Sequence, residues 1–265
     1  MLAFSLFDEE KGTDKDYLHL VSSIKNVAIS TQKTRGLTNS FMNGNVAAQL
    51  LVYAQREQMM KDFDAIKKLT AKVKLPENYT NESKSLMKKL KKLNKKAFKR
   101  KSGEVFASYT GVIEEWIVLN GKIIDTRFKS GDGDIYMAVS MLNNTLLPLT
   151  ENIGKLRGMG SGIVARGTCK EEETAKMHTF TTNIEHYRDT MESYLNKTGC
   201  NRLSPRDLKE FNKKIAAYTK LTNEKVIGKE EINLDANKFF DQGTACIDGV
   251  LKIYNAMETE IESKL

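Results

Sequence analysis

The sequence is poor in proline, cysteine and histidine, and it lacks long apolar runs. Its three prolines among 265 residues are about a quarter of the usual share of ~5%. This scarcity favours long helices over the short, turn-punctuated strands of a β-sandwich or barrel. Three cysteines exclude a disulfide scaffold, and three histidines exclude a histidine-rich metal protein. No segment approaches the ~18 consecutive apolar residues that indicate a membrane-spanning helix.

The residues that are present suffice for a folded core, with 40% hydrophobic and 29% charged, which excludes a disordered chain. The formal charge of +8 is unevenly distributed: ten of the eighteen residues from Lys84 to Lys101 are basic and none is acidic. Leu86, Leu90 and Leu93 recur there at helical spacing, which predicts a helix with a buried stripe and a solvated basic face. The competing interpretation is contact with a polyphosphate or an anionic lipid surface.

Hydrophobic periodicity of three to four residues predicts eight helices and no strand. The predicted ranges are 14–43, 45–75, 81–100, 104–129, 134–166, 171–197, 204–228 and 233–265. The strongest break is the stretch 130–133 (SGDG), which lies at the midpoint. We therefore expect an all-α fold of two four-helix bundles, the first over residues 1–131 and the second over residues 132–265, which together form one domain.

Two pairs of similar strings occur in the same order in the two halves. Residues 32–37 (QKTRGL) resemble residues 154–159 (GKLRGM), and their Arg-Gly pairs are 122 positions apart. Residues 106–114 (FASYTGVIE) resemble residues 240–248 (FDQGTACID), which are 134 positions apart. The shared order predicts that the two bundles arose by internal duplication.

Both ends of the sequence resemble the cut ends of a longer chain. Residues 2–7 (LAFSLF) form an apolar hexamer, and the last predicted helix runs to Leu265 without a stop signal. We expect a domain excised from a longer protein, with flanking membrane spans outside it.

The usual enzymatic constellations are missing. His19, His178 and His186 include no pair at the three-to-four spacing that places two metal ligands on one helix face. Cys169 and Cys200 flank a predicted helix and would lie about 40 Å apart, which is too far for a disulfide. We therefore predict free cysteines, no metal, no cofactor, no catalytic residue and no enzymatic activity.

The two Arg-Gly pairs are the clearest candidates for binding. Glycine in a helix interior costs about 1 kcal/mol relative to alanine, and it lets a neighbouring helix approach, so that Arg35 and Arg157 can face each other across a bundle. Hydroxyl and amide side chains share their helix faces at three- and four-residue spacing. The candidate ligand-binding set is Arg35, Arg157, Thr31, Gln32, Thr38 and Ser161. Such a socket suits a small planar oxyanion. The alternative is that each arginine pairs with an acid on a neighbouring helix in a buried salt bridge.

Residues 29–41 (ISTQKTRGLTNSF) resemble the opening helix of the nitrate- and nitrite-sensing (NIT) domain of bacterial signal-transduction proteins, which typically shows a Gln-x-x-Arg-Gly-x-Ser/Thr string. Arg56 and Asp62 are similar to positions of the family's second helix, and residues 106–113 with Tyr109 resemble a later string. The resemblance is best over residues 29–70 and 104–120. Thr34 departs from the family, where an acid commonly precedes the arginine, and this removes a local counter-charge.

NIT domains are input modules of chemoreceptors, histidine kinases and RNA-binding antiterminators, and they bind nitrate or nitrite through arginines. The resemblance therefore implies a two-bundle sensor domain in which Arg35 binds the anion and Arg157 follows by the repeat. It also implies the extracytoplasmic (periplasmic) part of a bacterial inner-membrane receptor, with a cytoplasmic protein as the alternative, and it is compatible with a homodimer. Because one helix holds most of the excess positive charge, we expect no nucleic-acid partner.

We expect the ligand to act by shifting the first or last helix by about 1–2 Å. Two other functions stay open. Two arginines suit small carboxylates and organic acids equally well, which would make the domain a sensor of those compounds. A helical scaffold whose basic helix contacts polyanions is the third interpretation.

Overall fold

The computed structural model describes residues 12–73 and 75–265, and these form helices joined by short turns with no strand among them, which confirms the all-α class. The elements are α1 (Asp14–Met42), α2 (Ala48–Val73), α3 (Glu77–Lys96), η1 (Ala97–Lys99), α4 (Ser102–Phe128), α5 (Gly133–Met141), η2 (Leu142–Leu146), α6 (Leu147–Arg166), α7 (Glu171–Thr198), α8 (Pro205–Lys225) and α9 (Ala236–Lys264). The π-helical turn η2 joins α5 to α6 without a break. If that helix is counted once, the described residues contain the eight long helices that periodicity predicts.

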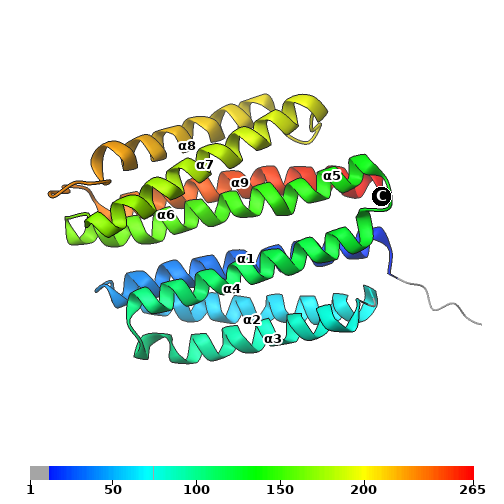
Figure 1. Cartoon of the computed structure of the whole chain (residues 1–265), viewed down its shortest axis with the longest axis horizontal. Coiled ribbons are helices and arrows are strands. Elements are labelled where there is room, and N and C mark those ends of the chain that lie inside the picture. The colour runs from blue at the N-terminus through cyan, green and yellow to red at the C-terminus, as the bar shows by residue number, and fades with distance from the viewer. Residues whose placement is uncertain (1–11, 74) are drawn as a thin grey trace, which may run out of the picture.

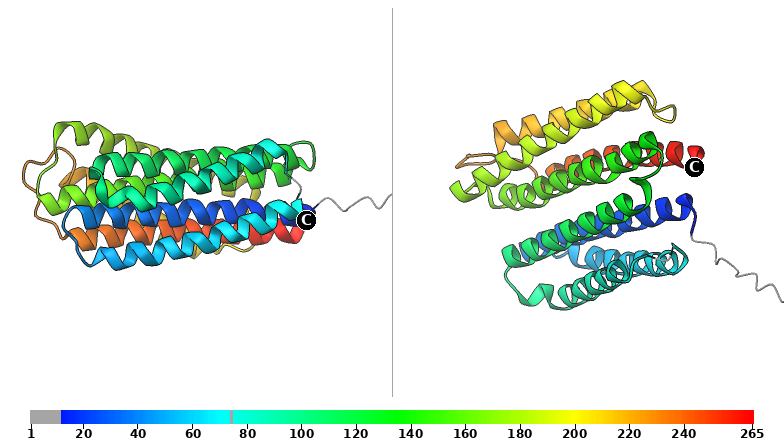
Figure 2. Two further views of the ribbon diagram at one scale, coloured as in Figure 1. Left: turned by 90° about the horizontal axis from the view of Figure 1, so that it is seen from below. Right: turned by 45° about the vertical axis from the view of Figure 1, so that its right-hand side comes forward.

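The helices pack in two groups that lie side by side along their lengths (Figures 1 and 2). In the first group α1 packs against α2 and α4, and α3 packs against α4. In the second group α6 packs against α7 and α9, and α8 packs against α9. The groups meet mainly where α1 contacts α6. The origin of the two groups by duplication and a boundary at residue 131 stay predictions.

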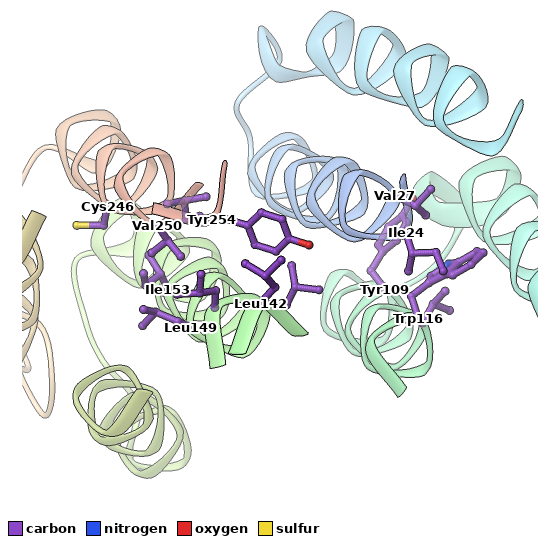
Figure 3. Close-up of a cluster of buried hydrophobic side chains, with 14 of the residues drawn as sticks. Ile24, Val27, Tyr109, Trp116, Leu142, Leu149, Ile153, Cys246, Val250 and Tyr254 are labelled. Carbon is purple, nitrogen blue, oxygen red and sulfur yellow. The ribbon is translucent and has the colours of Figure 1, made fainter. Parts of the chain in front are cut away.

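Apolar side chains of both groups belong to one contiguous cluster (Figure 3). In the first group Tyr109 and Trp116 of α4 are completely buried beside Ile24 of α1. In the second group Ile153 of α6 packs with Val250 of α9. Each such side chain contributes about 1.5–3 kcal/mol by its burial. Because the cluster crosses from one group to the other, the surface between α1 and α6 is part of the core.

The helix predicted over residues 134–166 is continuous, as predicted, but it is not α-helical throughout. Its middle, Leu142–Leu146, is a π-helical turn. Pro148 follows this turn; it has no N–H, and in a regular α-helix its ring would clash with the carbonyl of Asn144. A wider π turn accommodates the proline and inserts one residue, which rotates α6 relative to α5.

The other helix boundaries agree with the prediction to within a few residues. α2 begins at Ala48, later than predicted, because a turn closed by the Ala48 N–H and the Asn45 carbonyl (3.1 Å) comes first. α3 begins directly after Pro76 rather than at residue 81. The predicted cap of α8 is confirmed, since the Ser204 hydroxyl accepts a hydrogen bond from the Asp207 N–H at 3.1 Å.

The basic segment forms α3 and η1, and its apolar stripe is buried as predicted. Leu86, Leu90 and Leu93 are at most 7% exposed. The basic face is lined by Lys88, Lys91, Lys92, Lys95, Lys96, Lys99 and Arg100. The apolar hexamer at residues 2–7 lies outside the described residues. Of the helices within the described ranges, none combines the length and the apolar character needed to traverse a bilayer.

α1 begins and α9 ends at the same end of the molecule, to the right in Figure 1. There the two helices run antiparallel and are joined by polar contacts, which we call the α1–α9 seam. His19 Nε2 lies 3.0 Å from a carboxylate oxygen of Glu262, Lys25 lies 3.6 Å from the carboxylate of Glu258, and the Ser22 hydroxyl donates to Glu258.

Candidate functional site

The two Arg-Gly pairs meet where α1 and α6 cross. A Cβ atom built on Gly158 would lie 3.9 Å from the Cα atom of Gly36, so the two backbones approach closely. A Cβ atom on Gly36 would lie 3.6 Å from Nη2 of Arg157, and one on Gly154 would lie 3.1 Å from Nη2 of Arg35. Each arginine therefore extends over a glycine of the opposing helix, where no side chain obstructs it.

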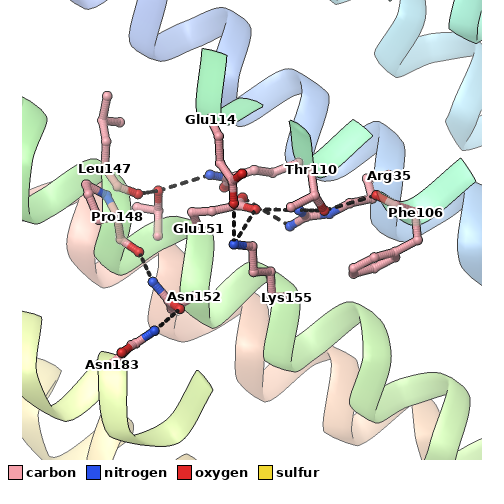
Figure 4. A network of polar contacts seen from close by, with 12 residues as sticks. Arg35, Phe106, Thr110, Glu114, Leu147, Pro148, Glu151, Asn152, Lys155 and Asn183 are labelled. Atoms are coloured by element: carbon pink, nitrogen blue, oxygen red, sulfur yellow. Dashed lines mark hydrogen bonds and ion pairs between the residues drawn. The ribbon is translucent and has the colours of Figure 1, made fainter. Parts of the chain in front are cut away.

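The Arg35 guanidinium is buried and its charge is neutralised (Figure 4). Nη1 and Nη2 donate to the two carboxylate oxygens of Glu151 on α6 at 2.5 and 3.1 Å, which is a bidentate pair. Nη1 also donates to the hydroxyl of Thr110 on α4 at 2.7 Å. The guanidinium lies over the Phe106 ring, 4.7 Å from its centroid. At this arginine the geometry is that of the buried salt bridge.

Arg157 has matching surroundings except for the carboxylate. Its Nη1 donates to the hydroxyl of Thr244 on α9 at 2.8 Å, and its guanidinium lies 4.5 Å from the centroid of Phe240. These two residues correspond, in the repeated string, to Thr110 and Phe106. Among the described residues no acid forms an ion pair with Arg157, and its Nε and Nη2 have no hydrogen-bond partner. The side chain is nevertheless buried.

This burial leaves one positive charge of the site uncompensated. Burial is the main reason why the pKa of Arg157 falls to about 10, and the charge of Arg35 lowers it further. Glu151 is already bound to Arg35, and Asp248, the other acid that raises this pKa, is exposed to solvent. An unpaired buried charge costs several kcal/mol, so Arg157 is a position that an anion would stabilise.

A phenol group lies beside Arg157. Tyr218 of α8 is buried, and its hydroxyl has no hydrogen-bond partner. A Cβ atom built on Gly243 of α9 would lie 2.8 Å both from this hydroxyl and from Cβ of Arg157, which places the two side chains next to each other. Burial raises the pKa of Tyr218 well above its ordinary value, so the group is a neutral O–H donor.

Of the other predicted site residues, Gln32 is close to an arginine. A Cβ atom on Gly154 would lie 3.1 Å from Arg35 Nη2 and 3.7 Å from Oε1 of Gln32, so both groups contact the same glycine. The Gln32 amide donates to the Thr150 hydroxyl at 3.2 Å, and its Oε1 has no partner. Gln32 therefore helps to hold α1 against α6 at this point.

The remaining three residues stand apart from the guanidinium contacts. Thr31 donates its hydroxyl to the Val27 carbonyl at 2.7 Å, so its proton is used within α1. Thr38 is buried beside Tyr109 in the first group and has an unpartnered hydroxyl. The Ser161 hydroxyl is buried and has no partner within the described part of the chain. No hydrogen bond joins any of these three hydroxyls to Arg35 or Arg157 within the described residues.

Sequence reasoning missed Glu151, Tyr218 and the two threonines that accept from the arginines. The repeated string that contains Thr110 and Thr244 was a usable signal, because both threonines stand four residues after a phenylalanine in strings that recur in order. Nothing in the local sequence of Glu151 or Tyr218 distinguishes them from other helical residues.

A groove of about 500 Å³ opens between α4 and α6 beside Arg35. Phe106 and Thr110 line it, so the groove reaches the side chains that contact the Arg35 guanidinium. Lys155, which also lines it, donates to Glu114 of α4 at 2.8 Å and lies 3.7 Å from Oε1 of Glu151 (Figure 4). The groove, whose lining is mostly apolar, therefore leads from solvent toward the buried pair.

The cysteines and the acidic residues show no sign of other chemistry. Cys169, Cys200 and Cys246 are free. Burial raises the pKa of the Cys246 thiol to about 12, which leaves it protonated and unreactive at neutral pH. Within the residues that the structure describes, no cluster of three or more histidine, cysteine or acidic side chains could hold a metal ion.

The fold and the site together define an all-α domain with a buried arginine pair between two helix groups. The family model for nitrate and nitrite sensing (NIT) matches residues 26–262. The chain belongs to this nitrate and nitrite sensing family. A solved structure of the NasR transcription antiterminator shares the fold with a TM-score of 0.74 and 13% identity, over 94% of this chain and 68% of that one. No curated protein matches the sequence.

Proposed function

We propose that the domain is a sensor input module that binds nitrate or nitrite beside Arg157. The observation that carries the proposal is the buried guanidinium without a carboxylate, whose Nε and Nη2 have no partner. These two groups form one edge of the guanidinium, and an edge of this kind binds two oxygens of a planar oxyanion in parallel. The Tyr218 hydroxyl, which is unpartnered and adjacent, supplies a third donor.

The charges of the site favour a monovalent anion. Arg35 is paired with Glu151, and Lys155 is paired with Glu114, so Arg157 contributes the single excess positive charge. Nitrate and nitrite each carry one negative charge and would neutralise it. A dicarboxylate would leave one negative charge unpaired in a buried position, which is unfavourable. Among organic acids, a small monocarboxylate such as acetate is the alternative ligand consistent with this charge balance.

Signal transmission follows from the position of the site between the two groups. Arg157 belongs to α6 and extends over Gly36 of α1, so an anion bound to it lies at the contact between the groups. A ligand shifts a conformational equilibrium only through its differential affinity for the two states. We propose that the anion favours one placement of α1 on α6, with a displacement of about 1–2 Å as the output.

The test is a thermal-unfolding panel with nitrate, nitrite, acetate, malate and chloride. At a nitrate concentration of about 100 Kd we expect a stabilisation of about 2.7 kcal/mol, which raises the Tm by about 5–10 °C for a chain of this size. Malate should give a much smaller shift. Arg157→Lys, which keeps the charge but loses the planar edge, should lose most of the nitrate shift.

The matched control is Arg166→Lys, because Arg166 lies on the same helix but is exposed and paired with Glu173. This variant should keep the full shift. The proposal is wrong if no anion of the panel raises the Tm of the parent chain, or if Arg157→Lys responds to nitrate as the parent does.

A further inference from the structure

We infer that Glu151 is an internal competitor of the anion: its carboxylate occupies Arg35 in this state, and the ligand displaces it onto Lys155. The inference rests on the proposed anion site at the α1–α6 crossing and adds its regulation and its selectivity for charge. It starts from an asymmetry, since two arginines in matching surroundings differ in only one partner.

The Glu151 carboxylate has the chemistry of the proposed ligand. A carboxylate is a planar group that presents two oxygens to a guanidinium in parallel, as nitrate does. Glu151 binds Arg35 in this way, at 2.5 and 3.1 Å. Six residues before Arg35 in the first half, the position that corresponds to Glu151 holds Ile29, so the carboxylate is no part of the repeated pattern. It is an additional anion on one of two similar cationic positions.

Lys155 gives the displaced carboxylate a second partner. It stands one helical turn after Glu151, and its Nζ already lies 3.7 Å from the same Oε1 atom that Arg35 binds. A change of side-chain rotamer is therefore enough to move the carboxylate from one cation to the other, with the α6 backbone unchanged. Lys155 can accept it and still keep its exposed partner Glu114, because an ammonium group has three donors. With one monovalent anion bound, the three cations Arg35, Arg157 and Lys155 are then balanced by three negative charges. The exchange avoids leaving a buried carboxylate unpaired, which is strongly unfavourable.

The exchange also changes where α1 is held on α6. The Arg35 guanidinium lies against Gly154, which is three residues from Glu151 on one side and three residues from Arg157 on the other. In the present state the charged link runs from Arg35 to Glu151. With an anion between Arg35 and Arg157, the charged link would run from Arg35 through the anion to Arg157. Arg157 lies six residues after Glu151, which is about 9 Å further along α6. Displacement of Glu151 thus couples binding to a new placement of the two helices.

The experiment measures nitrate affinity by isothermal titration calorimetry on the whole chain and four variants. Glu151→Gln removes the competitor and should bind nitrate about tenfold more tightly. In this variant Arg35 no longer has to break its ion pair with Glu151 before the anion can bind. The same variant gains one net positive charge and should bind malate more tightly than the parent does. Lys155→Gln removes the second partner and should weaken nitrate binding about fivefold.

Two further variants make the design specific. Lys155 affects nitrate binding only as the second partner of the Glu151 carboxylate. When that carboxylate is absent, the double variant Glu151→Gln/Lys155→Gln should therefore bind nitrate as tightly as Glu151→Gln alone. Glu173→Gln removes another acid from the rim of the same groove, where it pairs with Arg166, and should leave the affinity unchanged.

The outcomes separate the two proposals. If the parent chain binds none of the anions, the proposed function fails. If the parent binds nitrate but Glu151→Gln binds it equally or more weakly, the competitor role is refuted while the function stands. Should Glu151→Gln fail to fold, Lys155→Gln decides, and an affinity equal to that of the parent overturns the inference.

Discussion

At the scale of single residues, the two candidate arginines of the sequence differ in their ion-pair partners. Arg35 has a carboxylate 116 positions away in the chain, and Arg157 has none among the described residues. The residues themselves could be found from their glycine neighbours and their repetition. Their partners could not, because Glu151 and Tyr218 reach the site through the rotation and crossing of helices that are far apart in sequence. Thr31 illustrates the limit of helical spacing, which places it on the face of Arg35 although its hydroxyl bonds to its own backbone.

This difference predicts opposite effects of the same substitution. Arg35→Met removes the bidentate partner of Glu151, whose carboxylate then has only Lys155 in reach, and it should destabilise the ligand-free domain by about 1–3 kcal/mol. Arg157→Met removes an unpaired buried charge and should stabilise the ligand-free domain by about 1–3 kcal/mol, because an apolar side chain of similar length fills the same space. Chemical denaturation without added anion measures both values. A loss of stability in both variants would show that Arg157 is compensated in a way that its contacts do not reveal.

At the scale of the elements, hydrophobic periodicity predicts the helices well because each one buries a continuous stripe. The prediction failed where local backbone chemistry overrides this pattern. Pro148 is compatible with the start of a helix or with a kink, so it does not by itself predict a π turn. The apolar residues around it keep their helical spacing, so the hydrophobic pattern does not reveal the turn either. The early start of α3 was missed because Glu77 to Asn81 carry few apolar residues, although Pro76 is a suitable residue before a first turn.

The π turn sets the rotation of α6, and this can be tested by removing its extra residue. Deletion of Asn144 should restore α-helical register and turn Glu151 and Arg157 by about 100° relative to α5. We expect far-UV circular dichroism close to that of the parent, a Tm lowered by more than about 10 °C, and no response to nitrate.

The control for that deletion is Asn144→Ala, which keeps the register and removes an exposed side chain together with the one hydrogen bond that its Oδ1 accepts from the Asn143 amide at 2.8 Å. It should resemble the parent in both Tm and nitrate response. A deletion variant that keeps the parent's nitrate response would show that the turn does not position the arginines.

At the scale of the whole molecule, the arrangement in two groups was expected but the shared core was not. Periodicity shows which face of a helix is apolar and is silent on which neighbour covers it. For α1 the buried face extends around much of the helix, because α2 and α4 cover one side while α6 and α9 cover another. Gln32 and Arg35, both buried, mark the side that faces the second group, because their side chains bond to Thr150 and Glu151 of α6.

The basic face of α3 lies on the outside of the first group, on a helix that contacts no helix of the second group extensively. We therefore expect Lys88, Lys92, Lys95 and Lys96, replaced together by Gln, to leave the nitrate Kd within a factor of two at 0.15 M salt, where the screening length is about 8 Å. Titration calorimetry measures this. Sedimentation of the same variant with anionic vesicles tests the scaffold interpretation, which predicts that the parent binds the vesicles and the variant does not.

Under the proposed function, the α1–α9 seam would serve as the fulcrum about which α1 tilts. Its contacts hold α1 near Ser22, about 20 Å from the arginine crossing at Arg35 and about 12 Å from the start of the helix at Asp14. If α1 tilts about this fulcrum, Asp14 moves in the opposite direction to Arg35. Asp14 moves by about 0.6 of the distance, because the two arms are about 12 and about 20 Å long. A displacement of about 1–2 Å where the anion binds would therefore emerge beside the last turn of α9 as a smaller stroke in the opposite sense.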